Sequence, residues 1–275
     1  MLGEEHFFLE IGEQGQYLYC SYYEPVECSL SKAILVVPPI GHERLRCYRE
    51  SVNLARSLAS KGFHVFRFDY RGEGESYGCF EKYDVNTRLQ DINRAIEELI
   101  KKTNVNELCL LGFRLGAIFS LMVTESWGIH NIILCESVTN VKAHTRGLFR
   151  ANIIMQREYF GKITDNEKDL RMRLMNGEAI SIYGFHFSND LINQLEEIDE
   201  EELLNNFKGD SLFINFVRNG SSANSSCDHW NNILCKGGKS KIENLVNDFS
   251  WGTKKIWLPR FEGMERLIEG WLMQR

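Results

Sequence analysis

One short stretch of the chain has the spacing of a catalytic turn. In the run from Glu107 to Ala117, mostly apolar residues lead into Gly112-Phe-Arg-Leu-Gly116. This pattern predicts a buried strand, a tight turn and a helix start. In turns of the form G-x-S-x-G, the glycines let the chain bend so sharply that the central side chain stands exposed above the sheet. Here the central residue is Arg114, and a guanidinium, which only donates hydrogen bonds, cannot act as a nucleophile.

The segments around this turn predict a mostly parallel sheet wrapped by helices. Two short aromatic-rich segments on either side of residues 12–15 are typical of a β-hairpin. After them, apolar runs alternate with segments of helical periodicity, as in successive βα units. The expected strands are 7–11, 17–23, 33–37, 63–68, the apolar run before Gly112 and 131–135, and the expected helices are 46–61, 84–102 and 115–125.

Residues 139–205 break this alternation, because they are rich in Arg, Glu and Asn and contain no comparable apolar strand. We interpret them as a helical insertion that lies over the strand ends like a lid, with a solvated pair of connecting helices as the alternative. The α/β core then comprises residues 1–138 and 206–275. Within its second part we expect a strand at 211–217, a mobile Gly/Ser/Asn loop at 219–226, a last strand at 254–258 and a closing helix at 264–273.

Composition excludes several classes of function. The 275 residues carry a net charge of −6 with a pI near 5.7, which leaves no basic footprint for nucleic acid or for acidic membranes. No apolar run approaches the ~20 residues of a membrane span, and the first ten residues lack the features of a secretion signal. The eight cysteines are scattered, and Cys109 and Cys135 lie in expected strands, so we expect reduced thiols, a cytoplasmic protein and no cofactor.

Three landmarks stand in the order and spacing of one superfamily. They are Pro38-Pro-Ile-Gly-His42, Asp69-x-Arg71-Gly72-x-Gly74-x-Ser76 and Gly112-x-Arg114-x-Gly116. The chain resembles the α/β-hydrolases, in which these places belong to the oxyanion loop, a D-x-R-G-x-G-x-S loop and the nucleophile elbow. More closely, it is similar to the exosortase A system-associated hydrolases of the second type, whose members also carry G-L-R-L-G. That similarity continues through 183–191 and 195–198, while His42 and Tyr48 depart from the family's acidic and basic residues.

The resemblance implies an α/β-hydrolase fold with a helical insertion. It places the candidate oxyanion donors at Ile40, Gly41 and Leu115. It also implies a setting near exopolysaccharide and acyl-activation genes. The partner we expect is a small acyl or anionic ligand, with an acyl carrier protein as a further candidate.

The other parts of a catalytic triad are absent from their expected places. A triad needs a histidine after the last strand, held there by an acid. After Leu258 the sequence runs Pro259-Arg-Phe-Glu-Gly-Met-Glu265, without a histidine. The late His229 belongs to Cys227-Asp-His229 in the expected loop. A Cys/His pair or a metal site with Cys235 is conceivable there, but without a second ligand pair at close spacing we predict a plain loop and no metal.

An arginine at the elbow tip lies partly buried beside the strand ends and needs carboxylate partners. The same rim supplies four of them: Glu43, Asp69, Glu136 and Glu262. In one interpretation, these carboxylates neutralise Arg114 and fill the old site, with Asp69 and Glu262 as structural partners. In the other, Arg114 and the backbone N–H of Leu115 form an anion pocket beside that pairing.

Two functional hypotheses follow. The first is a non-classical enzyme that acts on, or transfers, an acyl or ester-like metabolite without a Ser-His-Asp triad, with Arg114, His42, Glu43 and Glu136 at its centre. The second is an inactive pseudo-hydrolase that binds a small anionic ligand or a carrier protein. An acid/base pair facing Arg114 in an open cavity favours the enzyme. A filled site with exposed apolar residues on the insertion favours the binding protein.

Overall fold

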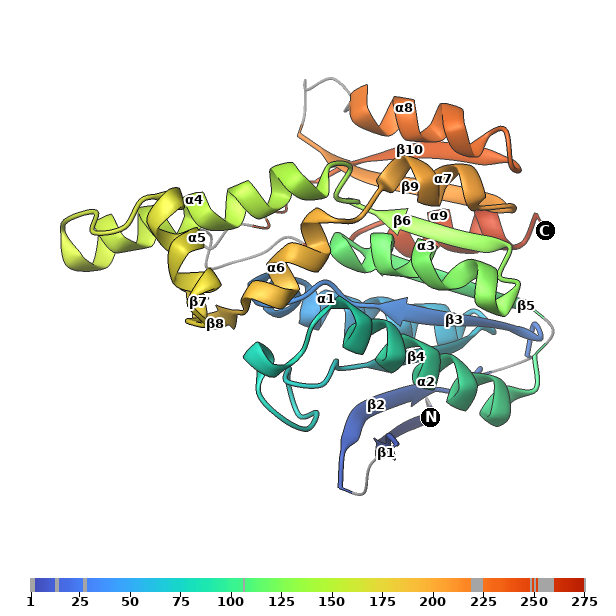
Figure 1. The fold of residues 1–275 in the computed structure, drawn as a ribbon. Helices are drawn as coiled ribbons and strands as arrows, with labels where there is room; N and C mark the ends of the chain where they lie inside the picture. The colour runs from blue at the N-terminus through green and yellow to red at the C-terminus, as the bar shows by residue number, and fades with distance from the viewer. Residues whose placement is uncertain are drawn as a thin grey trace.

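The computed structural model describes residues 3–12, 15–26, 29–105, 107–218, 225–247, 249, 251 and 260–274. These residues form one large mixed sheet with helices on both faces (Figure 1). Its strands are β1 (Glu4–Glu10), β2 (Tyr17–Tyr23), β3 (Lys32–Val37), β4 (His64–Phe68), β5 (Glu107–Phe113), β6 (Asn131–Cys135), β9 (Asp210–Val217) and β10 (Ser240–Val246). The spatial order is β1-β2-β4-β3-β5-β6-β9-β10, with the β1/β2 and β2/β4 pairs antiparallel and the later pairs parallel.

Helices cover both faces of this sheet, so its central strands are continuous apolar runs. The helices are α1 (His42–Ser60), the 3-10 turn η1 (Phe80–Lys82), α2 (Val85–Thr103), α3 (Leu115–Trp127), α4 (Val141–Phe160), α5 (Glu167–Met175), α6 (Asn189–Glu196), α7 (Glu200–Asn206), α8 (Ser225–Leu234) and α9 (Met264–Leu272). One core cluster joins the sheet to α1 and α9, and the other joins it to α2, α3, α7 and α8. The opening hairpin and the βα alternation that the sequence predicts are confirmed.

The segment between β6 and β9 is not purely helical, which corrects the expectation from sequence. Besides α4 to α7 it contains a short hairpin, β7 (Ile180–Ile182) and β8 (Phe185–Phe187), whose turn includes Tyr183 at a positive φ of 51°. Three-residue strands are too short to leave a periodic signal. The last helix, α7, packs against α3 on the face of the sheet, whereas α4 and α5 project away from it (Figure 1).

The C-terminal part differs from the expectation in two further ways. The edge strand β10 was not predicted, because its alternating half-buried residues lack the long apolar run of a central strand. Cys227 and His229 lie in helix α8 and not in a loop, because that helix already begins at Ser225. The strand expected at 254–258 lies outside the described residues. No helix in the described ranges is long and apolar enough to cross a membrane.

Candidate functional site

The turn between β5 and α3 has the geometry of a nucleophile elbow. Arg114 sits at its tip with φ 54° and ψ −120°, a strained conformation for a residue other than glycine, and its N–H donates to Cys135 O at 3.0 Å. A Cβ at Gly112 would lie 2.4 Å from Ala117 Cα, and one at Gly116 would lie 2.4 Å from Val37 O. The two glycines are therefore required by the close approach of backbone around the turn.

Two groups fix the Arg114 side chain. Its Nε donates to Glu43 Oε1 at 3.0 Å, and its Nη1 donates to the backbone oxygen of Glu136 at 3.0 Å. The guanidinium also lies 5.4 Å from the centre of the Trp251 ring. The Glu43 side chain is only 5% exposed and that of Arg114 21%, so the pair is largely shielded from water. This leaves Nη2 as the guanidinium nitrogen without a hydrogen-bond partner among the described residues.

The other three rim carboxylates have different partners. The Glu136 carboxylate accepts from Phe216 N at 2.6 Å and from Trp251 Nε1 at 3.0 Å, so it braces the neighbouring strand and loop. The expected pairing of Asp69 with Arg114 is wrong, because the buried Arg44 of α1 lies closer and contacts Asp69 at 2.6 Å.

Glu262 likewise has no contact with Arg114 in the described part of the chain. It lines a separate cavity of about 370 Å³ together with Arg49 and Arg260. Glu43 is thus the one rim carboxylate whose oxygens meet the elbow arginine.

Two histidines face this ion pair. His42, the first residue of α1, packs against the Tyr183 ring at 4.6 Å. Burial lowers its pKa, an effect that Glu43 opposes and Arg114 reinforces. His144 of α4 is half-buried, and desolvation, with help from Arg114 and His42 and against Glu43, lowers its pKa to about 4. Both imidazoles are therefore neutral at pH 7 and able to accept a proton.

Sequence reasoning missed His144. It stands in a polar segment with no motif around it, and only the path of α4 over the strand ends brings it to Glu43 and Arg114. The available signal was Asn140, whose side chain accepts from Ala143 N at 2.7 Å and caps the helix start. That cap fixes where α4 begins, but not what its first turn faces.

Three buried polar atoms of this region have no hydrogen-bond partner among the described residues: His42 Nδ1, Glu43 Oε2 and Ser137 Oγ. Burial disfavours the charge of Glu43, but the neighbouring Arg114 guanidinium outweighs it and holds the pKa of Glu43 below its usual range, so the carboxylate remains ionised at pH 7. Buried polar atoms are almost always satisfied in folded proteins. Their concentration beside the elbow therefore marks a place suited to a polar ligand group or to water.

The loop in the oxyanion position is partly occupied by the protein itself. The N–H of Gly41 donates to Glu73 Oε2 at 3.1 Å, and burial, opposed by Arg88, raises the pKa of Glu73 to about 7. The β7–β8 hairpin lies over this loop, since a Cβ at Gly41 would be 3.5 Å from Phe185. Ile40 is buried beside it, and Leu115 opens α3. Gly41 N–H is therefore already used, which leaves the N–H groups of Ile40 and of Leu115 at the helix start as the candidate donors.

The late Cys/His group does not form a site. Cys227 Sγ contacts Asn215 Oδ1 at 3.3 Å, His229 contacts Glu201 at 3.2 Å, and Cys235 points to Ser240 O. Across the described ranges, no cluster of three His, Cys, Asp or Glu side chains is placed to hold a metal ion.

Comparison with known proteins shows the family to which the chain with this site belongs. Residues 31–184, which include the oxyanion loop, the elbow and the β7–β8 turn, match the family described as serine aminopeptidase, S33. The chain belongs to this family. A search of curated proteins found no match for this S33 member.

Solved structures confirm the α/β-hydrolase fold of this S33 chain. Est1E from Butyrivibrio proteoclasticus covers 98% of this chain and 96% of its own at 12% identity, with a TM-score of 0.63, and Est1E with bound ferulic acid gives 0.65 at 14% identity over the same shares. An α/β serine hydrolase homologue from Coxiella burnetii also covers 98% and 96%, at 15% identity and a TM-score of 0.55. At such identities the likeness concerns the fold alone.

Proposed function

We propose that this S33 family member binds a small anionic or acyl ligand at the elbow and does not hydrolyse it by serine chemistry. The observation that carries the proposal is the position of the Arg114 guanidinium and its hydrogen bonds. Its guanidinium stands where the fold presents a nucleophile, is fixed by Glu43 and the Glu136 backbone oxygen, and keeps Nη2 free of partners within the described ranges. A fixed guanidinium with an unused N–H pair is a preorganised donor for a carboxylate, a phosphate or a carbonyl oxygen.

At the elbow, no serine and histidine of the described residues are hydrogen-bonded to each other, which supports binding over hydrolysis; the pairs His6–Ser21 and Ser29–His64 lie elsewhere. The sequence contains no histidine from residue 230 to residue 275, so no imidazole comes from the part of the chain that follows β10. Ser76 does not replace the nucleophile, because its Oγ donates to Asp69 O at 2.6 Å and accepts from Tyr19 N at 2.8 Å. Ser137 has a hydroxyl without a partner among the described residues, but it follows β6 and does not occupy the strained tip of the turn, where Arg114 stands.

The surrounding groups define which ligands fit. Glu43 already neutralises one positive charge, and the imidazoles of His42 and His144 are neutral. An incoming anion favours the protonated imidazole, so we expect proton uptake on binding and tighter binding at lower pH. The Leu115 N–H at the start of α3 adds a second donor aligned with the helix dipole.

Titration calorimetry with sodium octanoate tests this proposal. We expect octanoate to bind the parent at pH 7 and octanol, which lacks the carboxylate, to bind at least about 10-fold more weakly. Arg114→Lys keeps a cation but removes the forked donors, so it is expected to weaken octanoate binding about 10-fold or more. Arg56→Lys, at an exposed ion pair with Glu4, is the matched control. Equal octanoate affinity in the parent and in Arg114→Lys would contradict the proposal.

A second candidate function rests on the two histidines. The His42 imidazole, whose Nδ1 has no partner among the described residues, is placed to act as a general base on water or on an acyl acceptor while the guanidinium polarises a carbonyl oxygen; His144, with a pKa of about 4, is the weaker base. This is hydrolysis or transfer of an acyl or ester-like metabolite without a triad. Turnover of p-nitrophenyl butyrate that falls at least about 100-fold in His42→Gln would favour this function over simple binding.

A further inference from the structure

The part of the molecule that projects farthest from the sheet is an arm formed by α4, α5 and the loop between them, residues 141–175 (Figure 1). Its outer surface carries unusually exposed apolar side chains. Tyr159, Phe160 and Met175 are 74%, 73% and 71% exposed, more than any other large apolar residue in the described ranges. Ile154, Ile163 and Met172 of the same arm are also exposed. Neighbouring apolar side chains exposed to this degree mark an interaction surface and not a packing layer.

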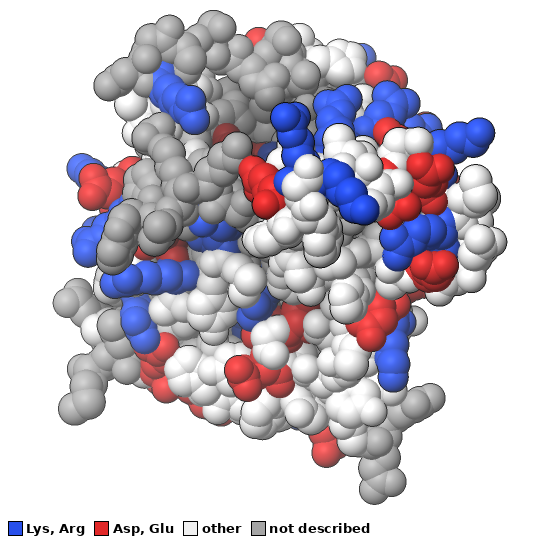
Figure 2. Space-filling view, turned by 90° about the vertical axis from the view of Figure 1, so that its left-hand side faces the viewer, with Lys and Arg blue, Asp and Glu red and all other residues white. Residues whose placement is uncertain are grey.

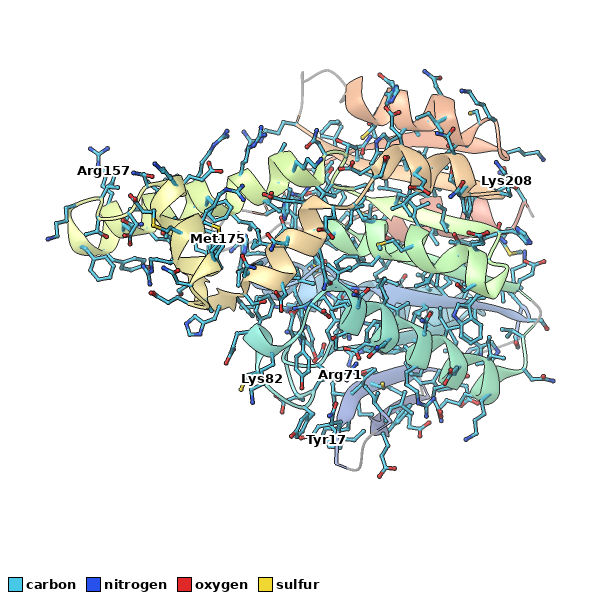
Figure 3. All side chains as sticks on the ribbon, viewed as in Figure 1. Tyr17, Arg71, Lys82, Arg157, Met175 and Lys208 are labelled. Carbon is cyan, nitrogen blue, oxygen red and sulfur yellow. The ribbon has the colours of Figure 1, made fainter. Side chains whose placement is uncertain are left out.

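Positive charge accompanies these side chains. The arm holds eight Lys and Arg against four Asp and Glu, a formal charge of +4 in a chain whose total is −6. On α4 the exposed cations Lys142, Arg146, Arg150 and Arg157 recur at spacings of four and seven, so they share one face of the helix. Arg157 points outward from the far end of α4 (Figure 3).

The distribution is visible from the side of the arm. Figure 2, which looks toward the arm, shows Lys and Arg side chains gathered beside uncharged surface. Asp165 pairs with Arg173 and Glu167 with Arg171 within the arm, and the same two arginines also pair with Glu178 and Glu196 outside it, so they add little to the charge that the arm presents. Lys142, Arg150 and Arg157 form no ion pair with any residue that the structure describes.

We propose that the tip of the arm docks on an anionic membrane surface. Aromatic and aliphatic side chains at a convex tip, next to Lys and Arg, suit the boundary between headgroups and acyl chains. Anionic headgroups attract the +4 arm and repel the rest of the chain, which carries the negative excess, so the molecule approaches with Tyr159 and Phe160 first. The shape decides against a protein groove as the first choice, because Tyr159 and Phe160 belong to the last turn of α4, which lies at the projecting end of the arm.

This docking is independent of ligand binding at the elbow, but the two places are physically connected. His144 belongs to the first turn of α4 and faces Arg114, while Tyr159 and Phe160 belong to its last turn. One helix therefore joins the elbow to the proposed membrane contact. A protein bound through this arm holds its elbow near a lipid surface, where acyl molecules partition.

Co-sedimentation with vesicles tests the proposal on the full chain. We expect the protein to sediment with phosphatidylcholine vesicles that contain 30% phosphatidylserine, to remain in solution with pure phosphatidylcholine, and to dissociate as salt is raised. The double variant Tyr159→Ser/Phe160→Ser is expected to lose at least about 10-fold in binding. Phe8→Ser, at an aromatic residue 60% exposed on β1, is the matched apolar control and is expected to bind like the parent.

Charge variants complete the test. Arg150→Glu/Arg157→Glu reverses two cations and is expected to weaken binding about 100-fold, whereas Arg266→Glu, at an arginine whose side chain is 80% exposed on α9, is expected to leave it unchanged. All these side chains are exposed, so unchanged melting temperatures verify the fold of each variant. The proposal fails if the parent ignores anionic vesicles at low salt, or if the tip variant binds as the parent does. Binding of soluble poly-glutamate that depends on Arg150 and Arg157, without vesicle binding, would instead identify an acidic protein as the partner.

Discussion

Replacing Arg114 with alanine tests whether the elbow arginine is a structural partner of Glu43. Alanine keeps a Cβ, so the strain of the positive φ is unchanged and only the guanidinium is lost. The Glu43 carboxylate, whose Oε1 accepts from Arg114 Nε and whose Oε2 has no partner among the described residues, is then left buried without a counter-charge. Removing one partner of a buried ion pair costs ~3–5 kcal/mol.

The lower end of this range applies, because the Arg114 side chain is about a fifth exposed while that of Glu43 is almost fully buried. A loss of about 3 kcal/mol lowers the melting temperature of a domain of this size by about 6–12 °C. The deficit is expected to shrink in acid, because Glu43 without Arg114 takes up a proton more readily. Adding Glu43→Gln to Arg114→Ala removes the orphaned charge and is expected to restore part of the stability.

Differential scanning calorimetry at pH 7 provides the measurement, with Arg56→Ala as the control. Arg56 contacts Glu4 through two hydrogen bonds of 2.9 Å, as short as those of Arg114, but its side chain is 45% exposed. Exposed pairs contribute about 0–1 kcal/mol, so the control is expected to lose at most about 4 °C. An Arg114→Ala variant that melts within 2 °C of the parent would refute the reasoning, because such a shift corresponds to a loss of only ~1 kcal/mol or less in the free energy of unfolding.

Three further predictions concern the groups around the elbow. The pKa of His144 is lowered to about 4 in the folded state, so the unfolded chain binds more protons between about pH 4 and 6.5. The stability of the parent therefore falls as pH drops through this window, and His144→Asn should flatten the fall in melting curves recorded across it. Burial raises the pKa of Glu73 to about 7, so the folded chain binds more protons between about pH 4.5 and 7, and stability falls as pH rises through that window. Glu73→Gln should remove this decline, and a variant with the pH profile of the parent would contradict the raised pKa of Glu73. Gly116→Ala places a Cβ 2.4 Å from Val37 O and should lower the melting temperature by several degrees, whereas Gly270→Ala on α9, where a Cβ meets nothing within 4 Å, should raise stability by up to ~1 kcal/mol.

The core of the fold could be predicted because its signals are local. The strand ending in Val37, the elbow between Gly112 and Gly116, and helix α2 after its cap Asp84 each carry a periodicity or a punctuation that a short window contains. Strand β10 could not be predicted in the same way. Its half-buried residues gain their place by pairing with β9, a contact that its own sequence does not encode.

The candidate site was predictable only where the backbone frame fixes a residue. Arg114 is placed by its two glycines, and Glu43 follows from the helix that starts directly after the oxyanion loop. Asp69 was assigned to the wrong arginine, because sequence distance does not reveal that Arg44 lies beside it. His144 reaches the site through the path of a 20-residue helix in the insertion, which depends on tertiary packing of the β7–β8 hairpin and α6 against α4.

The most direct test of the central claim, that no serine nucleophile operates at the elbow, is intact-protein mass spectrometry after exposure to a fluorophosphonate probe. A serine hydrolase treated in parallel verifies the reagent. Because Arg114 occupies the tip and a guanidinium cannot attack phosphorus, we predict that the folded parent keeps its mass. A one-to-one adduct whose peptide map places the probe on Ser137, whose buried hydroxyl lies beside the elbow without a partner among the described residues, would contradict the claim.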